Sequence, residues 1–431
     1  MYAIKQVFPE PLKRVYHRAL SLLAVLWYRS PSKKLIVVGV TGTNGKTTTC
    51  VMIANALEGA GAKTGAMTTA QIKIDRNVQT NTTKMTMPGR FALQRELRKM
   101  VQAGCRYAVI EVSSQGVVQH RHRGICFDVA VFTNLTPEHI EAHGGFDAYK
   151  KAKMDFFQYV AKSKRKRLAG ETVPKIAVLN AGDAHAKDFE FSGFDRVVWF
   201  GEGSTNQAKK IVDSLSGVSF FVKDQSVKLR FPGVPNAWNA STAIATAEAV
   251  GISLKKSIPR LEKMPSLPGR FQLIDQGQPW IVMVDYAAEP VALEILYQTI
   301  AKYPHNRIIH VLGSCGGGRD VARRPILGKI AGEHADIVII TNEDPYDDDP
   351  NTIIDQVAVG AKKAGKKVGK DLFLIEDRKE AIQKAMELAK EKDFVLLTGK
   401  GNEPWICVAG GKKQPWNEAE IASQAIRSSM V

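Results

Sequence analysis

Residues 39–48 read GVTGTNGKTT and directly follow the apolar run Leu35–Val38. An apolar strand that leads through a glycine-rich turn into a helix suits a phosphate site, because backbone N–H groups of the turn can point at phosphate oxygens. Lys46 would then neutralise the terminal phosphates, and the Thr47 hydroxyl would bind Mg²⁺. A glycine turn ahead of an ordinary helix is the alternative. The pattern predicts an ATP site that comprises Gly42, Thr43, Asn44, Gly45, Lys46, Thr47 and Thr48.

The chain length of 431 residues predicts more than one domain, since single hydrophobic cores stop growing near ~250–300 residues. The content of 44% hydrophobic and 24% charged residues is that of a globular protein, which excludes a disordered or fibrous chain. Five cysteines are scattered along the sequence without a C-x-x-C pair. Disulfides and a zinc site are therefore not expected, and a reducing cytoplasm fits.

The net charge of +17 points to anionic partners. Part of this charge lies in the run 162–167, which could contact nucleic acid or form a solvated loop. Aromatic residues do not interleave the run as a base-stacking surface requires, so we expect no nucleic-acid partner. ATP and an anionic substrate, or an anionic membrane surface, account for the charge equally well.

Residues 11–29 combine the apolar run 19–28 with the flanking cations Lys13, Arg14, Arg18 and Arg29. The run is far shorter than the ~20 residues that span a bilayer, and no signal-peptide cleavage site follows it. Two interpretations stay open. The segment is either an amphipathic helix docked on the protein's own surface or a basic, Trp- and Tyr-tipped helix that lies in the membrane interface, at its inner face.

Short apolar runs alternate with helical stretches along the chain, which indicates an α/β fold. The first series of predicted strands covers residues 35–40, 107–112, 128–134, 175–180 and 197–200. A Lys- and Pro-rich stretch then separates it from a second series at 280–285, 307–313, 336–341, 371–375 and 394–399. We expect a basic, apolar helical segment (1–34), a central P-loop-type ATPase domain with a parallel or mixed sheet (35–265) and a C-terminal Rossmann-like domain (266–431).

Polar side chains follow two of these predicted strands, at the sheet edge where open α/β folds bind ligands. One strand runs into Glu111, Ser113 and Ser114, and another leads through Thr133 to His139. A carboxylate and an imidazole from neighbouring strand ends could bind a second Mg²⁺ between ATP and an acceptor. Solvated or helix-capping side chains are the alternative.

Taken together, the motifs resemble the Mur ligases, the ATP-dependent amide-forming enzymes of peptidoglycan synthesis. The similarity is greatest to the members that add the third residue of the stem peptide. The matching stretches occur in family order at residues 41–48, 86–88, 93–94, 111–116, 133–144, 149–153, 236–239, 268–270, 285–287, 317–325 and 399–403.

The resemblance implies transfer of the ATP γ-phosphoryl group to a carboxylate of a muramyl-peptide-like acceptor, followed by attack of an amino acid's amine on the acyl phosphate. Lys46 would stabilise the transferring group, Thr47 would bind one Mg²⁺, and Glu111 with His139 would bind the second. Lys153 matches the family's carbamylated lysine; a plain surface lysine is the alternative. The implied catalytic residues are thus Lys46, Lys153 and His139.

The resemblance also implies the contacts of the nucleotide and the substrates. Asn236 and Asn239 would lie near the adenine, Arg270 would reach the ATP and Asp285 would lie near the nucleotide. The implied substrate contacts are Thr86, Ser113 and Ser114, together with Arg319, Asp344 and Glu403 for the incoming amino acid.

Several positions depart from the family pattern. Gln115, Ala288 and Asn402 replace family histidines, and Tyr346 replaces the arginine of members specific for diaminopimelate. The acidic residues Asp347–Asp349 lie nearby in the sequence. They either favour a substrate with a cationic side chain, such as lysine, or form a solvated acidic loop.

Family members of this type begin with a UDP-binding domain, whereas only about 35 residues precede the phosphate loop here. UDP would then be bound elsewhere, by a partner subunit for example, or the acceptor is lipid-linked. Two alternatives stay open: a superfamily ligase that acts on a lipid-linked or polyamino-acid acceptor, and a non-catalytic nucleotide-binding subunit.

Overall fold

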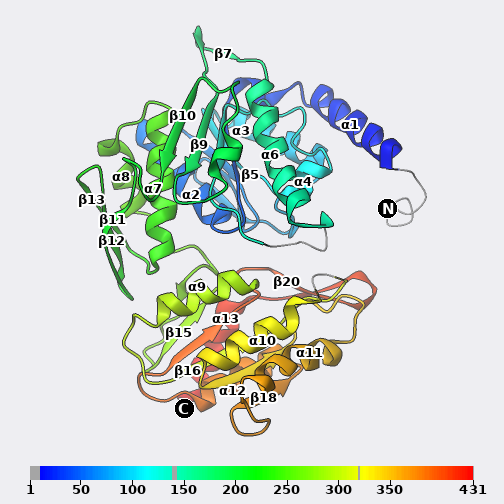
Figure 1. Cartoon of the computed structure of the whole chain (residues 1–431), viewed down its shortest axis with the longest axis vertical. Coiled ribbons are helices and arrows are strands. Elements are labelled where there is room, and N and C mark those ends of the chain that lie inside the picture. The colour runs from blue at the N-terminus through cyan, green and yellow to red at the C-terminus, as the bar shows by residue number, and fades with distance from the viewer. Residues whose placement is uncertain (1–9, 138–142, 319–320, 431) are drawn as a thin grey trace.

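A computed structural model describes residues 10–137, 143–318 and 321–430. The chain forms two layered α/β units stacked one above the other, the N-terminal part of the sequence above and the C-terminal part below (Figure 1). The expected α/β fold class is confirmed. The division at residues 265 and 266 stays a prediction, although the first strand of the second sheet begins at Gln272.

The first sheet has eight strands in the order β10-β9-β6-β1-β5-β2-β3-β4. All neighbours run parallel except the β2–β3 and β3–β4 pairs. The strands are β1 (Ile36–Thr41), β2 (Thr64–Met67), β3 (Gln71–Ile74), β4 (Asn77–Thr80), β5 (Tyr107–Glu111), β6 (Val129–Phe132), β9 (Ile176–Asn180) and β10 (Arg196–Phe200). Six buried residues in succession make β1 an interior strand covered on both faces.

Alternate residues of β1 pack into two separate cores, because successive strand side chains point to opposite faces. Val38 and Val40 lie in the core formed with α2 (Lys46–Leu57), α7 (Val234–Ala249) and α8 (Leu254–Glu262). Val37 lies in the other core, formed with α3 (Arg90–Gln102), α4 (Ser114–Val118) and α6 (Phe146–Lys162). The sheet is thus a middle layer packed on both faces, and loops of the candidate site begin at its strand ends.

The second sheet has six strands in the order β14-β15-β19-β16-β17-β18, of which only β14 is antiparallel to its neighbour. They are β14 (Gln272–Leu273), β15 (Ile281–Val284), β16 (Ile308–Leu312), β17 (Ile337–Thr341), β18 (Leu372–Ile375) and β19 (Phe394–Leu397). The helices of this unit are α9 (Pro290–Ile300), α10 (Arg323–His334), α11 (Pro350–Lys363), α12 (Arg378–Leu388) and α13 (Glu418–Ser429).

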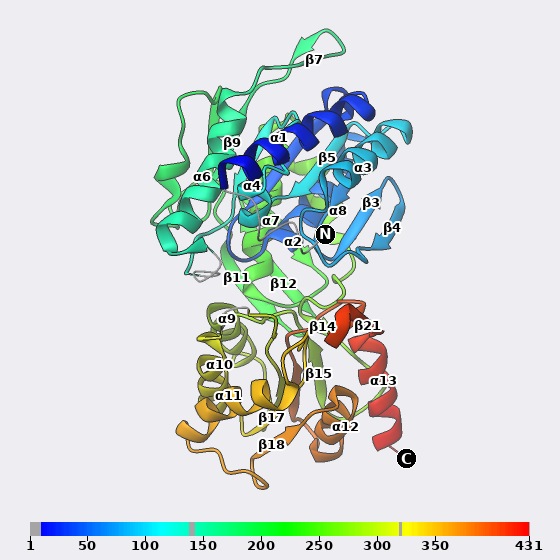
Figure 2. The ribbon, with the colours of Figure 1, turned by 90° about the vertical axis from the view of Figure 1, so that its right-hand side faces the viewer.

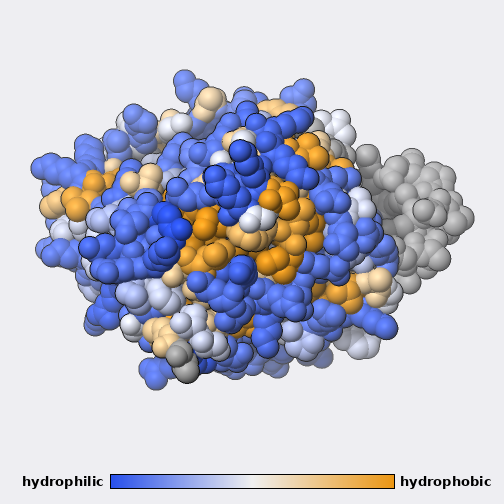
Figure 3. Space-filling model, turned by 90° about the horizontal axis from the view of Figure 1, so that it is seen from below, coloured by the Kyte–Doolittle hydropathy of each residue, from blue (hydrophilic) through white to orange (hydrophobic). Residues whose placement is uncertain are grey.

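Smaller elements complete the fold. A three-stranded antiparallel sheet and two hairpins consist of β11 (Lys209–Ser214), β12 (Gly217–Val222), β13 (Gln225–Leu229), β7 (Arg167–Leu168), β8 (Glu171–Thr172), β20 (Trp405–Val408) and β21 (Lys412–Pro415). The short 3₁₀ helices are η2 (Pro31–Lys34), η3 (Glu58–Ala60), η4 (Ala186–Phe189) and η5 (Ala409–Gly411). From below, the second unit shows an apolar area surrounded by hydrophilic side chains (Figure 3).

Helix α1 (Glu10–Trp27) lies on the outside of the first unit against α3 (Figure 2). Within the described residues, no helix is both long and apolar enough to cross a membrane. The basic run 162–167 is partly structural, since Arg165 ion-pairs with Asp195 at 2.6 Å and Lys166 is held by Asp128 at 2.8 Å.

Candidate active site

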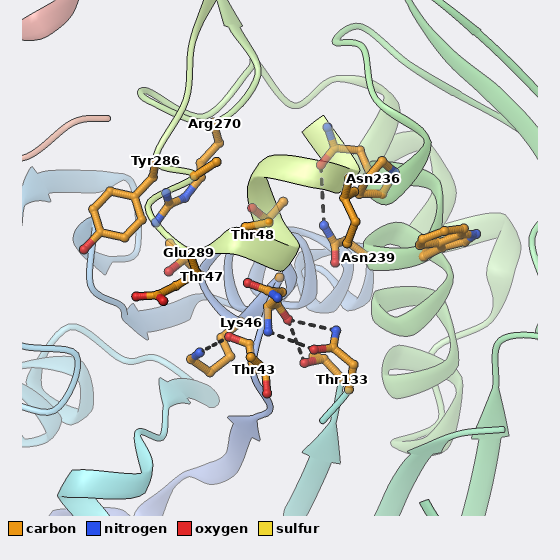
Figure 4. A pocket seen from close by; sticks show the side chains of 18 of the residues that line it. Thr43, Lys46, Thr47, Thr48, Thr133, Asn236, Asn239, Arg270, Tyr286 and Glu289 are labelled. Carbon is orange, nitrogen blue, oxygen red and sulfur yellow. Dashed lines mark hydrogen bonds between the residues drawn. The ribbon is translucent and has the colours of Figure 1, made fainter. Parts of the chain in front are cut away.

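The predicted phosphate loop joins the end of β1 to the start of α2 (Figure 4). Gly42 and Gly45 have positive φ angles, and a Cβ at Gly45 would lie 2.6 Å from Asn239 Oδ1, so the loop requires glycine there. No side chain caps the first turn of α2, which leaves its backbone N–H groups as donors. The Lys46 ammonium donates to the Thr43 carbonyl at 2.6 Å and has further donors for phosphate oxygens. This cradle fits the phosphates of a nucleotide.

Two residues at the end of β6 hold the loop in shape. The Asn134 side chain accepts from Asn44 N at 2.8 Å, and the Thr133 hydroxyl donates to the Asn44 carbonyl at 2.8 Å. A third bond joins Thr43 N to the Asn134 carbonyl at 2.8 Å. The sequence indicated polar residues at this strand end but not this bracing role.

Thr47 and Glu111 meet beneath the loop. The Thr47 hydroxyl donates to the Glu111 carboxylate at 2.9 Å, and Thr69 N donates to the same oxygen at 2.7 Å. Glu111 is only 2% exposed, and parallel pairing of β1 with β5 places it opposite Val40. Hydroxyl and carboxylate oxygens are ligands that Mg²⁺ prefers, so each of these side chains suits such an ion.

The histidine expected beside that pair, His139, lies outside the described residues. Among the residues that the structure does describe, no three His, Cys, Asp or Glu side chains gather as a metal cluster. Lys153 lies behind the loop on α6 with 1% exposure, and its ammonium donates to the Gly42 carbonyl at 2.6 Å. It contacts the loop's backbone but does not line the cleft.

A cleft of about 710 Å³ lies between the two units and is lined by residues of both. Asn236 and Asn239 on α7 line one wall, with Trp238 half-exposed between them. Arg270 and Asp285 line the opposite wall, where the Arg270 guanidinium stacks 4.1 Å from the centre of the Tyr286 ring (Figure 4). Trp238 and Tyr286 were not predicted from the sequence; their aromatic faces suit a stacked base or cation.

Asp285 is fixed at the start of the loop after β15. Its carboxylate accepts from Phe271 N and Ala287 N, each at 2.8 Å. Burial raises the pKa of the Asp285 carboxyl above its usual range, and the nearby Arg270 opposes that rise.

Four charged side chains form a compact cluster at the far end of the cleft. Lys84 Nζ lies 2.7 Å from Asp344 and 2.6 Å from Glu403, while Lys400 Nζ lies 3.0 Å and 2.8 Å from the same carboxylates. Burial would raise the pKa of Asp344, but Lys400 and Lys84 outweigh it and hold that pKa below its usual range. Glu403 and Asp344 likewise raise the pKa of Lys84 against the effect of burial.

This cluster changes the interpretation of Asp344 and Glu403, which were expected to hold the incoming amino acid. Both carboxylates already face two ammonium groups, one of them contributed by the first unit. Neither lysine was singled out from the sequence, because Lys84 and Asp344 are 260 positions apart. Arg319, the cation expected beside them, lies outside the described residues.

The remaining predicted residues divide between the cleft and its surroundings. Thr86 lines the cleft and accepts a hydrogen bond from the Thr69 hydroxyl at 2.9 Å. Ser113 caps α4 through Gly116 N at 3.1 Å, and Ser114 is hydrogen-bonded to His143 at 3.0 Å. Neither serine lines the cleft.

The three aspartates that follow Tyr346 accept hydrogen bonds from backbone N–H groups. Asp349 caps α11 through Thr352 N at 2.9 Å, and Asp347 accepts from Gly410 N at 2.8 Å. Asp348 accepts from Gly317 N at 3.0 Å. The structure therefore favours the ordinary loop over a preformed site for a substrate cation.

Comparisons with known proteins agree with this geometry. Residues 40–247 match the Mur ligase middle domain, and residues 269–401 match the Mur ligase glutamate ligase domain. The chain belongs to the Mur ligase family. Members of this family are ATP-dependent, ADP-forming ligases, so the chain is such a ligase and uses ATP with Mg²⁺.

The chain is 38% identical to a UDP-N-acetylmuramyl-tripeptide synthetase of Roseiflexus sp. (strain RS-1), over 97% of this chain and 84% of that protein. A diaminopimelate-adding ligase of Bacillus cereus, named UDP-N-acetylmuramoyl-L-alanyl-D-glutamate–2,6-diaminopimelate ligase, is 34% identical over 97% and 83%.

Solved structures give the same picture of the fold. A diaminopimelate ligase structure matches with a TM-score of 0.62 and 27% identity over 99% of this chain and 84% of that one. Folylpolyglutamate synthase of Mycobacterium tuberculosis matches with a TM-score of 0.70 over 91% of this chain and 96% of that one. At 17% identity the second match concerns the fold alone.

Proposed function

We propose that this Mur ligase adds an amino acid to a muramyl-peptide acceptor, a step of peptidoglycan precursor synthesis. The observation that carries the proposal is a single cleft with a phosphate loop and the Thr47–Glu111 pair on one side and the Lys84–Asp344–Lys400–Glu403 cluster at its end. The names of its relatives, a tripeptide synthetase and diaminopimelate ligases, support an acceptor of this class.

The reaction has two steps, phosphoryl transfer to the acceptor and then amide formation. A carboxylate oxygen of the acceptor attacks the γ-phosphorus of ATP, the bond to the β-phosphate oxygen breaks, and ADP leaves. The amine nitrogen of the amino acid then attacks the acyl carbon, phosphate leaves, and the nitrogen loses a proton to give the amide. Lys46, at the mouth of the loop, stabilises the negative charge of the transferring group.

The residues that would hold Mg²⁺ are Thr47 for one ion and Glu111 with His139 for a second. Bound Mg²⁺ neutralises phosphate charge and lets the carboxylate approach it. Lys153 would carry a carbamate, which converts a cation into an anion beside the loop. The burial of Lys153 and its bond to the Gly42 carbonyl support a role for this side chain beside the loop.

Because the cleft lies between two units, their closure could exclude water from it. Hydrogen bonds already join the units, from Trp405 Nε1 to the Thr82 carbonyl at 3.1 Å and from Tyr303 to Asp213 at 2.9 Å. Closure of the units around the substrates would keep water from the acyl phosphate, which otherwise hydrolyses.

The amino acid that we propose has a neutral or cationic side chain. Tyr346 stands where diaminopimelate-specific members carry an arginine, and losing a charge-assisted pair costs about 1.5–3 kcal/mol. Preference for diaminopimelate would therefore fall by roughly ten- to a hundredfold.

A phosphate-release screen tests the function. ATP and Mg²⁺ are supplied with UDP-N-acetylmuramoyl-L-alanyl-D-glutamate or its lipid-linked counterpart, and lysine competes with meso-diaminopimelate at equal concentration. We expect release only when acceptor and amino acid are both present, with lysine preferred. A clear preference for diaminopimelate would contradict the assignment of Tyr346, and release without any acceptor would contradict the ligase reaction. The lipid-linked arm decides whether the enzyme works at the inner membrane face or on a soluble acceptor.

A further inference from the structure

The outward face of α1 is apolar although the helix lies on the surface of the protein (Figure 1). Its large exposed side chains form two rows that lie beside each other on one side of the helix, because positions 16, 23 and 27 are seven and four residues apart and positions 22 and 26 are four apart. They are Tyr16 (55% exposed), Leu22 (62%), Leu23 (55%), Leu26 (73%) and Trp27 (77%). We call these five residues the α1 stripe.

Small residues of α1 face the protein instead. Ser21 and Ala24 are buried, and the Ser21 hydroxyl donates to the His120 carbonyl at 3.1 Å. Val25 packs so closely on Gly124 that a Cβ there would lie 2.3 Å from its Cγ2. An ordinary amphipathic surface helix buries its large apolar residues, whereas four large apolar side chains in the last two turns of α1 are exposed. The helix is therefore docked through its small side and leaves the α1 stripe for a partner.

The surroundings of the stripe are basic. Residues 10–34 contain six Lys or Arg and a single acidic residue, Glu10. The exposed cations Arg29, Lys33 and Lys34 directly follow the stripe along the chain. Helix α3 contacts both α1 and η2 and adds exposed Arg95 and Lys99, which share one buried carboxylate, Glu96, as their ion-pair partner at 3.1 Å.

We propose that α1 is an interfacial helix that binds an anionic phospholipid surface. Large apolar side chains with an indole at one end enter the headgroup boundary, while the flanking cations meet the lipid phosphates. A second copy of the chain fits less well, because two equally basic surfaces would repel each other. This site is separate from the cleft, so the inference does not depend on the proposed substrates.

Vesicle sedimentation of the full-length protein tests the proposal. We expect binding to phosphatidylglycerol–phosphatidylcholine vesicles, weakening with salt, and little binding to phosphatidylcholine alone. Leu26→Glu should lower the affinity about tenfold or more, whereas Val368→Glu, at a similarly exposed valine of the other unit, should not. Replacing Arg29, Lys33 and Lys34 by Gln should lower the affinity for anionic vesicles about fivefold for each cation.

A second readout locates the contact. Brominated lipid chains should quench a part of the tryptophan fluorescence that Trp27→Phe removes. Phosphate release with a water-soluble acceptor should be unchanged in every α1 variant, which separates this proposal from the ligase function. The proposal is overturned if the wild-type protein does not sediment with anionic vesicles or if Leu26→Glu binds as well as wild type. It is also overturned if the wild type is a dimer that Leu26→Glu dissociates.

Discussion

We propose Lys46 as the residue on which phosphoryl transfer depends most. We expect Lys46→Ala to abolish ATP turnover, by a factor of about 10² or more, while the protein stays folded, because the loop is held by backbone and β6 contacts that do not involve this side chain. The measurement is ADP release, with the exposed Lys34→Ala as control. Turnover at the wild-type rate in folded Lys46→Ala would contradict the assignment of the phosphate loop.

Lys153 tests whether an anion is needed behind the loop. We expect Lys153→Ala to be nearly inactive and to regain activity when a small carboxylic acid is added, since the missing group is an anion. Lys153→Glu should work without bicarbonate, which a carbamate requires. The carbamate is ruled out if Lys153→Arg keeps full activity.

The ion cluster makes a pH-dependent prediction. The pKa of Asp344 is lowered, so its contribution to stability is present above its ordinary pKa of about 3.9 and is lost as the pH falls through the folded value. The pKa of Lys84 is raised, so its contribution persists below its ordinary pKa of about 10.4 and is lost only above it. The cluster is therefore intact near pH 7.

We expect Lys84→Met to lower the free energy of unfolding at pH 7 by about 3 kcal/mol, because it leaves buried carboxylates with one ammonium instead of two. The loss should shrink as the pH falls below the ordinary pKa of Asp344. Urea unfolding at pH 7 and at a pH below the ordinary pKa of Asp344 measures the two losses of stability. Lys63→Met, which breaks a surface pair with Asp75, is the control. Equal losses for both variants would show that the cluster has no special role.

At the scale of elements, the loop between β1 and α2 is held by geometry that only glycine satisfies. Gly45 and Gly61 have nearly the same φ, 77° and 73°, but only Gly45 lies against a side chain. We expect Gly61→Ala to cost about 1 kcal/mol of stability with ATP affinity unchanged. Gly45→Ala should in addition lower ATP affinity about tenfold or more, because its Cβ pushes against Asn239. Calorimetric titration with ATP compares them, and equal affinities would contradict the loop assignment.

Most strands that the sequence predicted are buried on both faces, whereas β10 and β18 were predicted although most of their residues are only half-buried. β1, β5, β6 and β9 appear as continuous apolar runs, and the structure has each of them. β4 is exposed at all four positions, so no hydrophobic pattern could indicate it. β11 to β13 were not predicted, because their exposed residues interrupt the apolar pattern and they form only a short antiparallel sheet.

The candidate site divides in the same way. The phosphate loop could be predicted because its parts are adjacent in sequence and its chemistry is local. The partners of Asp344 and the bracing of Asn44 by Asn134 could not, because they depend on how distant segments pack. Ser113 shows the opposite case: the structure has it capping a helix outside the cleft, so its contact with substrate stays a prediction.

At the scale of the whole molecule, the two units each supply one wall of the cleft, so we expect the reaction to require both. The first unit holds the phosphate loop and Glu111, and the second supplies Arg270, Asp285 and most of the ion cluster. Lys84 is the exception, since it belongs to the first unit and pairs with carboxylates of the second. Binding of substrates between the units would thus be coupled to their closure.

The most direct test of the central claim is the stoichiometry of ADP to amide product in the wild-type enzyme supplied with ATP, Mg²⁺, UDP-N-acetylmuramoyl-L-alanyl-D-glutamate or its lipid-linked form, and an amino acid. We expect one ADP for each amide bond formed, no ADP when acceptor is omitted, and no product when EDTA removes Mg²⁺. ADP formation that continues at the same rate without acceptor, or amide formation without ADP, would contradict a ligase that works through an acyl phosphate.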